Sequence, residues 1–226
     1  MVMPLIKLKT KLYAHQQKAV DKLSKIKVGA LYMEMGTGKT RTALELVAKR
    51  YNAGKVNHIL WLCPCSVKDN LREDILKHKG DLSNIDIYGI ESLSSSDRLY
   101  VKLLDLVAKR NCYLIVDESS LVKNHRAIRT NRITKLAEHC QYKLILNGTP
   151  ISRNEADLFA QWYILDWRIL GYRSYWSFQA NHLEYDDYGK IRRVLNTDYL
   201  ANKIAPYTYQ VLKKDCLDLP RKTYDT

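Results

Sequence analysis

The run Gly-Thr-Gly-Lys-Thr at residues 36–40 constrains the fold of this chain more than any other feature of the sequence. It follows a short apolar run at residues 29–32 and precedes a helical pattern at residues 41–51. Glycines let the backbone curl so that successive N–H groups and the start of the helix face an anion. The run therefore predicts a phosphate-binding loop, although Met33 stands where the usual eight-residue pattern begins with glycine.

Phosphate chemistry gives the polar residues of this run separate roles. Lys39 would reach the terminal phosphates of a nucleotide, and the Thr40 hydroxyl would ligate magnesium. A chance occurrence of the same letters is the alternative. The residues expected to bind the phosphates are Gly36, Thr37, Gly38, Lys39 and Thr40.

Short apolar runs alternate with amphipathic stretches up to about Pro150. The runs are rich in Ile, Leu, Val and Tyr, which is typical of buried parallel strands. Strands that alternate with helices predict an α/β fold with a mostly parallel central sheet flanked by helices. The predicted strands are residues 29–32, 59–63, 112–116 and 143–146.

Asp117 and Glu118 directly follow the apolar run at residues 112–116. Acidic side chains at the carboxyl end of a buried parallel strand lie where ligands of such sheets bind. Asp117 is expected to hold magnesium, directly or through water, and Glu118 to orient and deprotonate the attacking water. A helix N-cap role for Asp117 before Ser119 and Ser120 is the alternative. The phosphate loop upstream favours the nucleotide interpretation.

The chain carries 37 Lys and Arg residues against 24 Asp and Glu residues, a net charge of +13. Such an excess is typical of a polyanion-binding surface, although solubility also explains it. Residues 121–135 contain no acidic side chain, and the spacing of their basic residues predicts a helix with a collar of positive charge. Phosphate contact and a solvated helix face both remain open. The basic residues of this segment are Lys123, Arg126, Arg129, Arg132 and Lys135.

Beyond Glu155 the sequence becomes rich in aromatic residues and mainly helical in pattern, with a turn predicted at residues 184–190. The aromatic side chains of residues 159–178 can pack in a core or stack on bases, and burial statistics favour packing. Five cysteines without a Cys-x-x-Cys pair support neither a disulfide framework nor a zinc site. We therefore expect reduced and mostly buried thiols.

Together these motifs resemble those of the Swi/Snf-type branch of the superfamily II helicase-like ATPases, which are related to the DEAD/H-box proteins. The likeness covers nearly the whole chain. Leu-Tyr-Ala-His-Gln at residues 12–16 is similar to the adenine-reading element, and Cys-Pro-Cys-Ser at residues 63–66 to a motif that touches the nucleic-acid strand. Leu-Asn-Gly-Thr-Pro-Ile at residues 146–151 resembles the motif that couples nucleotide state to nucleic-acid grip. Residues 206–222 resemble the segment that closes the first lobe.

The resemblance implies a first RecA-like lobe with ATP and Mg²⁺ as cofactors. It implies an ATP-binding lobe at residues 1–154 and a helical appendage with a return segment at residues 155–226, both in one structural unit. Gln16 is implied to contact adenine, Thr40 and Asp117 to hold Mg²⁺, and Lys39, Asp117 and Glu118 to act in catalysis. The implied coupling residues are Asn147, Gly148 and Thr149, and the implied nucleic-acid contacts are Pro64, Ser66, Asn70, Lys123, Arg126 and Arg129.

The sequence departs from the family pattern at several places. Ser119 and Ser120 stand where the family usually has alanine and histidine, and Asn147 where it usually has threonine. In the family these positions lie near the residues that relay ATP turnover to strand movement, so the departures affect this relay more than the nucleotide chemistry. Residues 75–93 are short beside the family pattern, so we expect the sheet to be trimmed there.

The implied function is that of the ATP-binding N-terminal motor lobe of a DNA-dependent ATPase that translocates along double-stranded DNA. A second RecA-like lobe, whose arginines complete the ATP site, is expected in the same parent chain or in trans. The chain alone should bind ATP better than it hydrolyses it. The alternatives are a non-catalytic nucleic-acid-binding or scaffold domain and a self-contained small P-loop ATPase.

The sequence contains neither an apolar stretch of membrane-spanning length nor a signal-peptide pattern. We therefore expect no membrane partner and a cytoplasmic location, which would be the host cytoplasm for a viral protein or the nucleus for a eukaryotic one.

Overall fold

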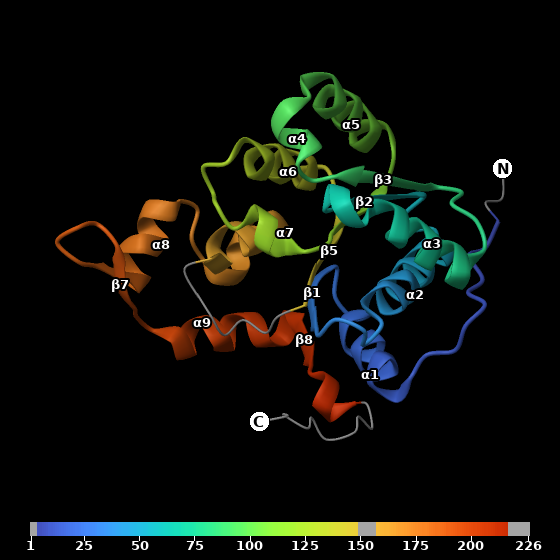
Figure 1. Ribbon diagram of the computed structural model, residues 1–226, viewed down its shortest axis with the longest axis horizontal. Helices are drawn as coiled ribbons and strands as arrows, with labels where there is room; N and C mark the ends of the chain where they lie inside the picture. Colours follow the sequence, from blue (N-terminus) through green and yellow to red (C-terminus); the bar gives the residue numbers. More distant parts are fainter. Residues whose placement is uncertain (1–3, 149–156, 217–226) are drawn as a thin grey trace, which may run out of the picture.

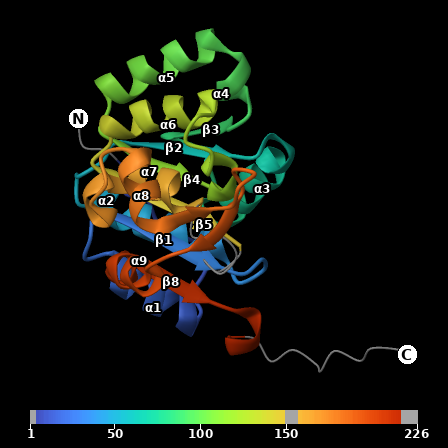
Figure 2. The same ribbon diagram turned by 90° about the vertical axis from the view of Figure 1, so that its left-hand side faces the viewer.

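The chain folds around a parallel β-sheet that helices cover on both faces (Figures 1 and 2). The computed structural model describes residues 4–148 and 157–216. Within these residues the main sheet has six strands in the order β3-β2-β4-β5-β1-β8, and every neighbouring pair is parallel. The α/β fold predicted from the sequence is confirmed. The strands are β1 (Val28–Met33), β2 (His58–Cys63), β3 (Ile85–Gly89), β4 (Cys112–Val116), β5 (Tyr142–Asn147) and β8 (Thr208–Val211).

The four predicted strands are confirmed as β1, β2, β4 and β5. All five residues of β4 are buried, and so is every residue of β2 after His58. Interior strands of a parallel sheet are covered on both faces, so they consist of almost continuous apolar residues. This is why short apolar runs were sufficient to locate them.

The expectation that the sheet is trimmed within residues 75–93 is wrong, because β3 forms there. It pairs with β2 from Ile59 opposite Ile85 to Cys63 opposite Gly89. As an edge strand, β3 alternates between buried and half-buried positions. Five alternating residues contain no continuous apolar run, so the pattern that reveals interior strands does not reveal this one.

The helices form two layers, one on each face of the sheet. Leu31 and Met33 of β1 pack in the cluster that α1, α2 and α3 cover, whereas Ala30 and Tyr32 face the cluster under α5, α6, α7 and α9. The helix predicted after the glycine-rich run is confirmed as α2. Each helix of the described residues is too short or too polar to cross a lipid bilayer. These helices are α1 (Ala14–Leu23), α2 (Lys39–Asn52), α3 (Lys68–Lys79), α4 (Ser92–Ser95), α5 (Asp97–Lys109), α6 (Ile128–Glu138), α7 (Leu158–Leu170), α8 (Tyr175–His182) and α9 (Thr197–Ile204).

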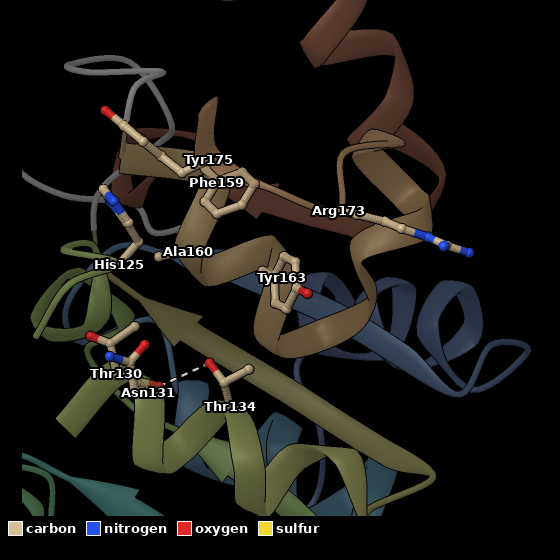
Figure 3. A pocket seen from close by; sticks show the side chains of 9 residues that line it. All are labelled: His125, Thr130, Asn131, Thr134, Phe159, Ala160, Tyr163, Arg173 and Tyr175. Atoms are coloured by element: carbon tan, nitrogen blue, oxygen red, sulfur yellow. Dashed lines mark hydrogen bonds between the residues drawn. The ribbon is translucent and has the colours of Figure 1, made fainter. Parts of the chain in front are cut away.

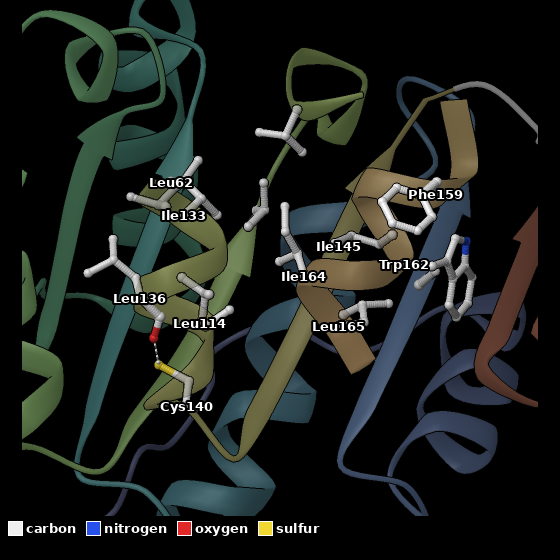
Figure 4. Close-up of a cluster of buried hydrophobic side chains, with 14 of the residues drawn as sticks. Leu62, Leu114, Ile133, Leu136, Cys140, Ile145, Phe159, Trp162, Ile164 and Leu165 are labelled. Atoms are coloured by element: carbon white, nitrogen blue, oxygen red, sulfur yellow. Dashed lines mark hydrogen bonds between the residues drawn. The ribbon is translucent and has the colours of Figure 1, made fainter. Parts of the chain in front are cut away.

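The second layer contains the larger aromatic core (Figure 4). Trp162 and Phe178 are completely buried, so the packing interpretation of these aromatic side chains is confirmed, whereas Trp176 remains 65% exposed. Burial of large apolar side chains is the main favourable term in folding, so α7 is held firmly on the sheet. The core combines Leu62, Leu114 and Ile145 of the sheet with Ile133 and Leu136 of α6 and Phe159, Ile164 and Leu165 of α7.

The C-terminal part contains the predicted helices, but it also contains strands that the sequence did not predict. β6 (Leu183–Tyr185) and β7 (Ile191–Val194) form a small antiparallel hairpin, and the turn predicted at residues 184–190 joins them. After α9 the chain returns to the main sheet as β8, which pairs with β1. This return brings the last described residues beside the phosphate loop.

The five cysteines are all free. Three of them, Cys63, Cys112 and Cys140, are buried, while Cys65 is exposed. Burial raises the pKa of the Cys63 thiol to about 12 and that of the Cys140 thiol also to about 12, so both are protonated at neutral pH. The expectation of mostly buried thiols is confirmed for these three, while Cys216 is half-buried.

Candidate nucleotide-binding site

The loops that follow β1 and β4 open at the carboxyl edge of the sheet. In the sheet order only β5 lies between these two strands. Parallel strands place their carboxyl ends on one edge, and ligands of open α/β sheets bind at that edge. The glycine-rich run after β1 and the acidic pair after β4 therefore share one region.

The loop after β1 curls tightly around the carbonyl oxygen of Glu34. Thr37 donates to this oxygen from its backbone nitrogen at 3.2 Å and from Oγ1 at 2.7 Å. Gly36 and Gly38 both have left-handed backbones, with φ of 84° and 85°. A side chain at either position would be strained, so the curl requires the two glycines that the sequence supplies.

Helix α2 begins immediately after this loop with several free N–H groups. The first intrahelical bond of the helix runs from Thr42 N to Gly38 O at 3.1 Å. No acidic residue lies in the first turn, and no side chain caps the helix. The N–H groups of Lys39, Thr40 and Arg41 precede the hydrogen-bonded turns, as at any helix start. Together with the helix dipole they favour an anion at this end.

Two side chains at the start of α1 form hydrogen bonds with the loop. His15 Nε2 lies 2.8 Å from Thr37 O, and Gln16 Nε2 donates to the same oxygen at 3.1 Å. Gln16 Oε1 accepts from Tyr13 N at 2.9 Å, and the residue is only 2% exposed. A Cβ atom on Gly38 would lie 2.1 Å from Gln16 Nε2. Gln16 thus fixes the loop, and its contact with adenine stays a prediction.

Lys39 is the first residue of α2 and directly follows the loop. Its Nζ donates to Met33 O at 3.0 Å. Burial lowers the pKa of Lys39, while the negative charges of Asp117 and Glu118 act in the opposite direction. The structure therefore brings the predicted lysine and the two predicted acids together, although they are far apart in sequence.

Asp117 continues the hydrogen-bonding pattern of the sheet, because its backbone nitrogen donates to Leu62 O at 2.7 Å. Burial raises the pKa of its carboxyl group, and the negative charge of Glu118 adds to this rise. The backbone N–H of Glu118, 2.9 Å from Asp117 Oδ1, and the charge of Lys39 oppose it. A carboxylate that has lost water in this way is stabilised by a nearby cation.

Glu118 has an unusual backbone conformation for a residue with a large side chain. Its φ of 49° and ψ of 58° are left-handed. Strain of this kind costs about 1–3 kcal/mol and is concentrated at functional sites. Glu118 precedes a short 3₁₀ helix and provides no side-chain cap, nor does Asp117 take that position. The N-cap alternative for Asp117 is therefore not supported.

The serines after the acidic pair connect it to the second helix layer. Ser119 is fully buried and donates from Oγ to Gln161 Oε1 on α7 at 2.6 Å. Ser120 donates from Oγ to Glu118 Oε1 at 3.2 Å. Gln161 belongs to no sequence motif, because it is a single polar residue within an aromatic helix.

The predicted coupling residues follow β5. Asn147 is the buried last residue of that strand. A Cβ atom on Gly148 would lie 3.6 Å from Lys39 Nζ, so this backbone borders the lysine. Thr149 lies outside the described residues.

The residues predicted to contact nucleic acid form two groups. Pro64, Ser66 and Asn70 lie between the carboxyl end of β2 and the first turn of α3, and Ser66 and Asn70 are exposed. Lys123 and Arg126 are exposed in the turn before α6, while Arg129 is half-buried within α6.

The predicted basic collar is wrong in its shape, because α6 begins only at Ile128. Its cations also have partners within the protein. Arg129 Nε donates to Leu121 O at 2.8 Å, and Arg132 donates to Leu93 O at 3.0 Å and pairs with Asp97. The remaining contacts are Lys123 with Asp157 at 3.2 Å, Lys135 with Glu138 at 3.0 Å, and Arg126 over the Trp176 ring at 5.7 Å.

A small hollow of about 230 Å³ lies between α6 and α7, on the face of the sheet that does not carry α2 (Figure 3). His125 stacks on Tyr175 with 3.7 Å between ring centroids. Burial lowers the pKa of His125, and the charge of Arg126 lowers it further. Thr134 and Phe159 line the hollow, and α2 packs on the other face of the sheet. The hollow is therefore separate from the phosphate-loop region.

The parallel sheet and the loops at its carboxyl edge define a RecA-like α/β domain. A family model described as SNF2-related domain matches residues 83–225, and another, described as type III restriction enzyme, res subunit, matches residues 9–152. The chain belongs to the SNF2-related family, as the sequence motifs had suggested.

Among the relatives, a SWI/SNF-related matrix-associated actin-dependent regulator of chromatin subfamily A containing DEAD/H box 1A from Danio rerio is 30% identical over 183 residues, or 69% of this chain and 17% of its own. A SWI/SNF-related matrix-associated actin-dependent regulator of chromatin subfamily A-like protein 1 homolog from Caenorhabditis elegans is 26% identical over 149 residues, or 60% of this chain and 21% of its own.

The fold is similar to that of the Sulfolobus solfataricus SWI2/SNF2 ATPase core in complex with dsDNA. The TM-score is 0.74 at 22% identity, and the match covers 94% of this chain and 46% of that one. The chain thus spans less than half of this solved structure and about a fifth of the length of the two relatives.

Proposed function

We propose that the chain is the ATP-binding first motor lobe of a DNA-dependent ATPase that translocates along double-stranded DNA. The observation that carries this proposal is the convergence of Lys39, Asp117 and Glu118 beside a left-handed glycine loop. In this proposal residues 1–154 and 155–226 act as one lobe, because β8 of the second segment pairs with β1 of the first.

The residues of the site fit Mg²⁺ and a nucleotide. Magnesium prefers oxygen ligands, and Thr40 and Asp117 would supply a hydroxyl and a carboxylate. The bound ion would neutralise charge that develops on the phosphates. Lys39 and the free N–H groups of α2 would bind the phosphates, and Glu118 would accept a proton from water.

A second RecA-like lobe would complete the site across the cleft, in the same parent chain or in trans. Arginine fingers in related phosphoryl-transfer enzymes increase the rate by about 10³–10⁵-fold. We therefore propose that the described lobe binds ATP well and hydrolyses it slowly alone. Asn147, Gly148 and Thr149 would relay the nucleotide state, and the border between Gly148 and Lys39 supports this.

The proposal of DNA as the partner rests on three observations. The exposed residues Ser66 and Asn70 follow β2 at the carboxyl edge of the sheet, and Arg126 is exposed beside Trp176. The net charge of +13 favours a polyanion. The Sulfolobus neighbour of the same fold is described in complex with dsDNA.

Calorimetric titration of the chain with ATP and Mg²⁺ tests the nucleotide half of this proposal. We expect saturable binding that Lys39→Ala weakens by about 10- to 100-fold, the effect of losing a hydrogen bond to a charged group. Lys49→Ala is a matched control, because Lys49 is an exposed lysine of the same helix.

Three results would contradict the proposal. Absence of ATP binding by the unmodified chain would favour the scaffold alternative. Equal binding by Lys39→Ala would remove Lys39 from the site. Rapid hydrolysis by the 226 residues alone, unaffected by duplex DNA, would favour a self-contained ATPase.

A further inference from the structure

The segment that follows β8 is tied directly to the phosphate loop. Glu34 N donates to Val211 O at 3.1 Å, and Glu34 Oε2 accepts from Lys213 N at 2.8 Å. Glu34 therefore bonds this segment through both its backbone and its side chain. These two bonds place the short 3₁₀ turn Lys213–Asp215 against the loop.

The side chain of Lys213 lies over the glycine curl. A Cβ atom on Gly36 would lie 3.3 Å from Lys213 Cε and 3.7 Å from Lys213 Nζ. Lys213 is half-buried, whereas the next residue, Lys214, is exposed. Within residues 4–148 and 157–216, no carboxylate forms an ion pair with the Lys213 ammonium group, and the Glu34 carboxylate accepts from the Lys213 backbone N–H.

Lys213 and Lys39 approach the loop from different directions. Lys39 comes from the start of α2, and Lys213 from the segment after β8. The charge of Lys213 acts on Lys39 strongly enough to contribute to its lowered pKa. Two ammonium groups beside the free N–H groups of α2 repel each other, and a polyanion that lies between them would relieve this repulsion.

We propose that Lys213 is a second phosphate-binding lysine of the site, which contacts the polyphosphate of the nucleotide opposite Lys39. This inference rests on the proposed function and extends it to the return segment. Because Lys213 also holds Glu34 through its backbone, phosphate binding would fix the position of the chain that leaves β8. The nucleotide would thus order two distant parts of the sequence at once.

The test compares Lys213→Ala with Lys214→Ala by calorimetry, using ATP and inorganic tripolyphosphate, each with Mg²⁺. Tripolyphosphate has no base, so it isolates the phosphate contact. We expect Lys213→Ala to weaken binding of both probes by about tenfold, as for loss of a charge-assisted hydrogen bond. Lys214→Ala removes the same charge one residue further on and should stay within about twofold.

Lys213→Arg and Lys213→Gln keep a long side chain and serve if Lys213→Ala is unstable. Arginine should restore most of the affinity, and glutamine should not. If the unmodified chain binds ATP and both Lys213→Ala and Lys213→Gln bind it equally or more tightly, the Lys213 proposal is overturned while the proposed function stands. If the unmodified chain binds neither probe, the proposed function itself fails.

Discussion

The loops after β1 and β4 meet at one edge of the sheet but are built in opposite ways. The loop after β1 takes left-handed conformations only at Gly36 and Gly38, where they cost little. The loop after β4 takes one at Glu118, where a side chain makes it unfavourable. The first loop offers N–H groups to an anion, and the second offers carboxylates to a cation.

The two loops also differ in their support. Hydrogen bonds from His15, Gln16 and Lys213 hold the loop after β1 from two sides. In the loop after β4, burial raises the pKa of Asp117, so its ionised form lacks full stabilisation. The backbone of the phosphate loop is therefore close to unstrained. The acidic loop instead lowers the stability of the fold, as is common for residues that are placed to bind a ligand.

The largest expected effect concerns the acidic loop. Glu118→Gln should lower ATP turnover by about 10²–10⁴-fold in the parent protein that carries both lobes, because a general base is lost. ATP binding by the same variant should remain within about threefold, because glutamine keeps the size of the side chain. Steady-state turnover and calorimetry measure the two effects separately. Normal turnover by this variant would show that Glu118 has no part in the chemistry.

The second effect concerns the phosphate loop. Gly38→Ala should reduce the free energy of unfolding by about 2–4 kcal/mol, because the new Cβ displaces the buried Gln16 amide and breaks its hydrogen bonds. Gly171→Ala is the control, since Gly171 has a φ of 88° but no atom within 4 Å of a Cβ. The control should lose only about 1 kcal/mol. Equal losses in urea unfolding would mean that Gln16 does not press on the loop.

The third effect sharpens the electrostatic half of the comparison. Burial raises the pKa of Asp117, so the folded chain binds its proton more readily than the unfolded chain does. The contribution of this group to the free energy of unfolding therefore falls as pH rises above the ordinary aspartate value. Asp117→Asn should raise the Tm at neutral pH by about 2–4 °C, the equivalent of about 1 kcal/mol for a chain of this size.

This difference in Tm between Asp117→Asn and the unmodified chain should shrink as the pH is lowered and the carboxyl group becomes protonated. The variant should also bind Mg²⁺ with ATP more weakly. A lower Tm for the variant at neutral pH would indicate that Lys39 and the Glu118 N–H more than compensate for burial.

The smallest effect tests backbone strain. Glu118→Gly should increase the free energy of unfolding by about 1 kcal/mol or less, because relief of strain exceeds the added entropy of the unfolded chain. Asn196→Gly is the control, because Asn196 has a similar φ of 56° but belongs to a residue type that tolerates it. The control should change by a few tenths of a kcal/mol. A loss of stability in Glu118→Gly would mean that backbone strain at Glu118 does not distinguish the two loops.

Local pattern was sufficient for the parts of the site that lie within one strand, loop and helix. The glycines, Lys39 and the start of α2 are contiguous, so the curl of the loop follows from residues 29–51 alone. Apolar runs located the four interior strands, because strands covered on both faces need apolar residues throughout. The edge strands β3 and β8 have weaker patterns and were not found.

Charge in the sequence was a poorer guide than hydrophobic pattern. The basic residues from Lys123 to Lys135 predicted a collar of positive charge, but most of them form hydrogen bonds to carbonyl oxygens or ion pairs with carboxylates. No sequence pattern predicted a role for Lys213, yet its side chain lies over the loop without an ion-pair partner in the described part of the chain. For Lys123 and Arg132 the partners Asp157 and Leu93 are distant in sequence, so the availability of these cations depends on the tertiary structure.

The sequence by itself determined the class of fold, the phosphate loop and the acidic pair, because hydrophobic periodicity and glycine conformation act over a few residues. Only the tertiary structure decided that Asp117 lies near enough to Lys39 to influence its pKa, that His15 and Gln16 hold the loop, and that the segment after β8 carries Lys213 to it. These contacts join residues up to 179 positions apart, as Glu34 and Lys213 do. They depend on the order of strands in the sheet, which no local pattern encodes.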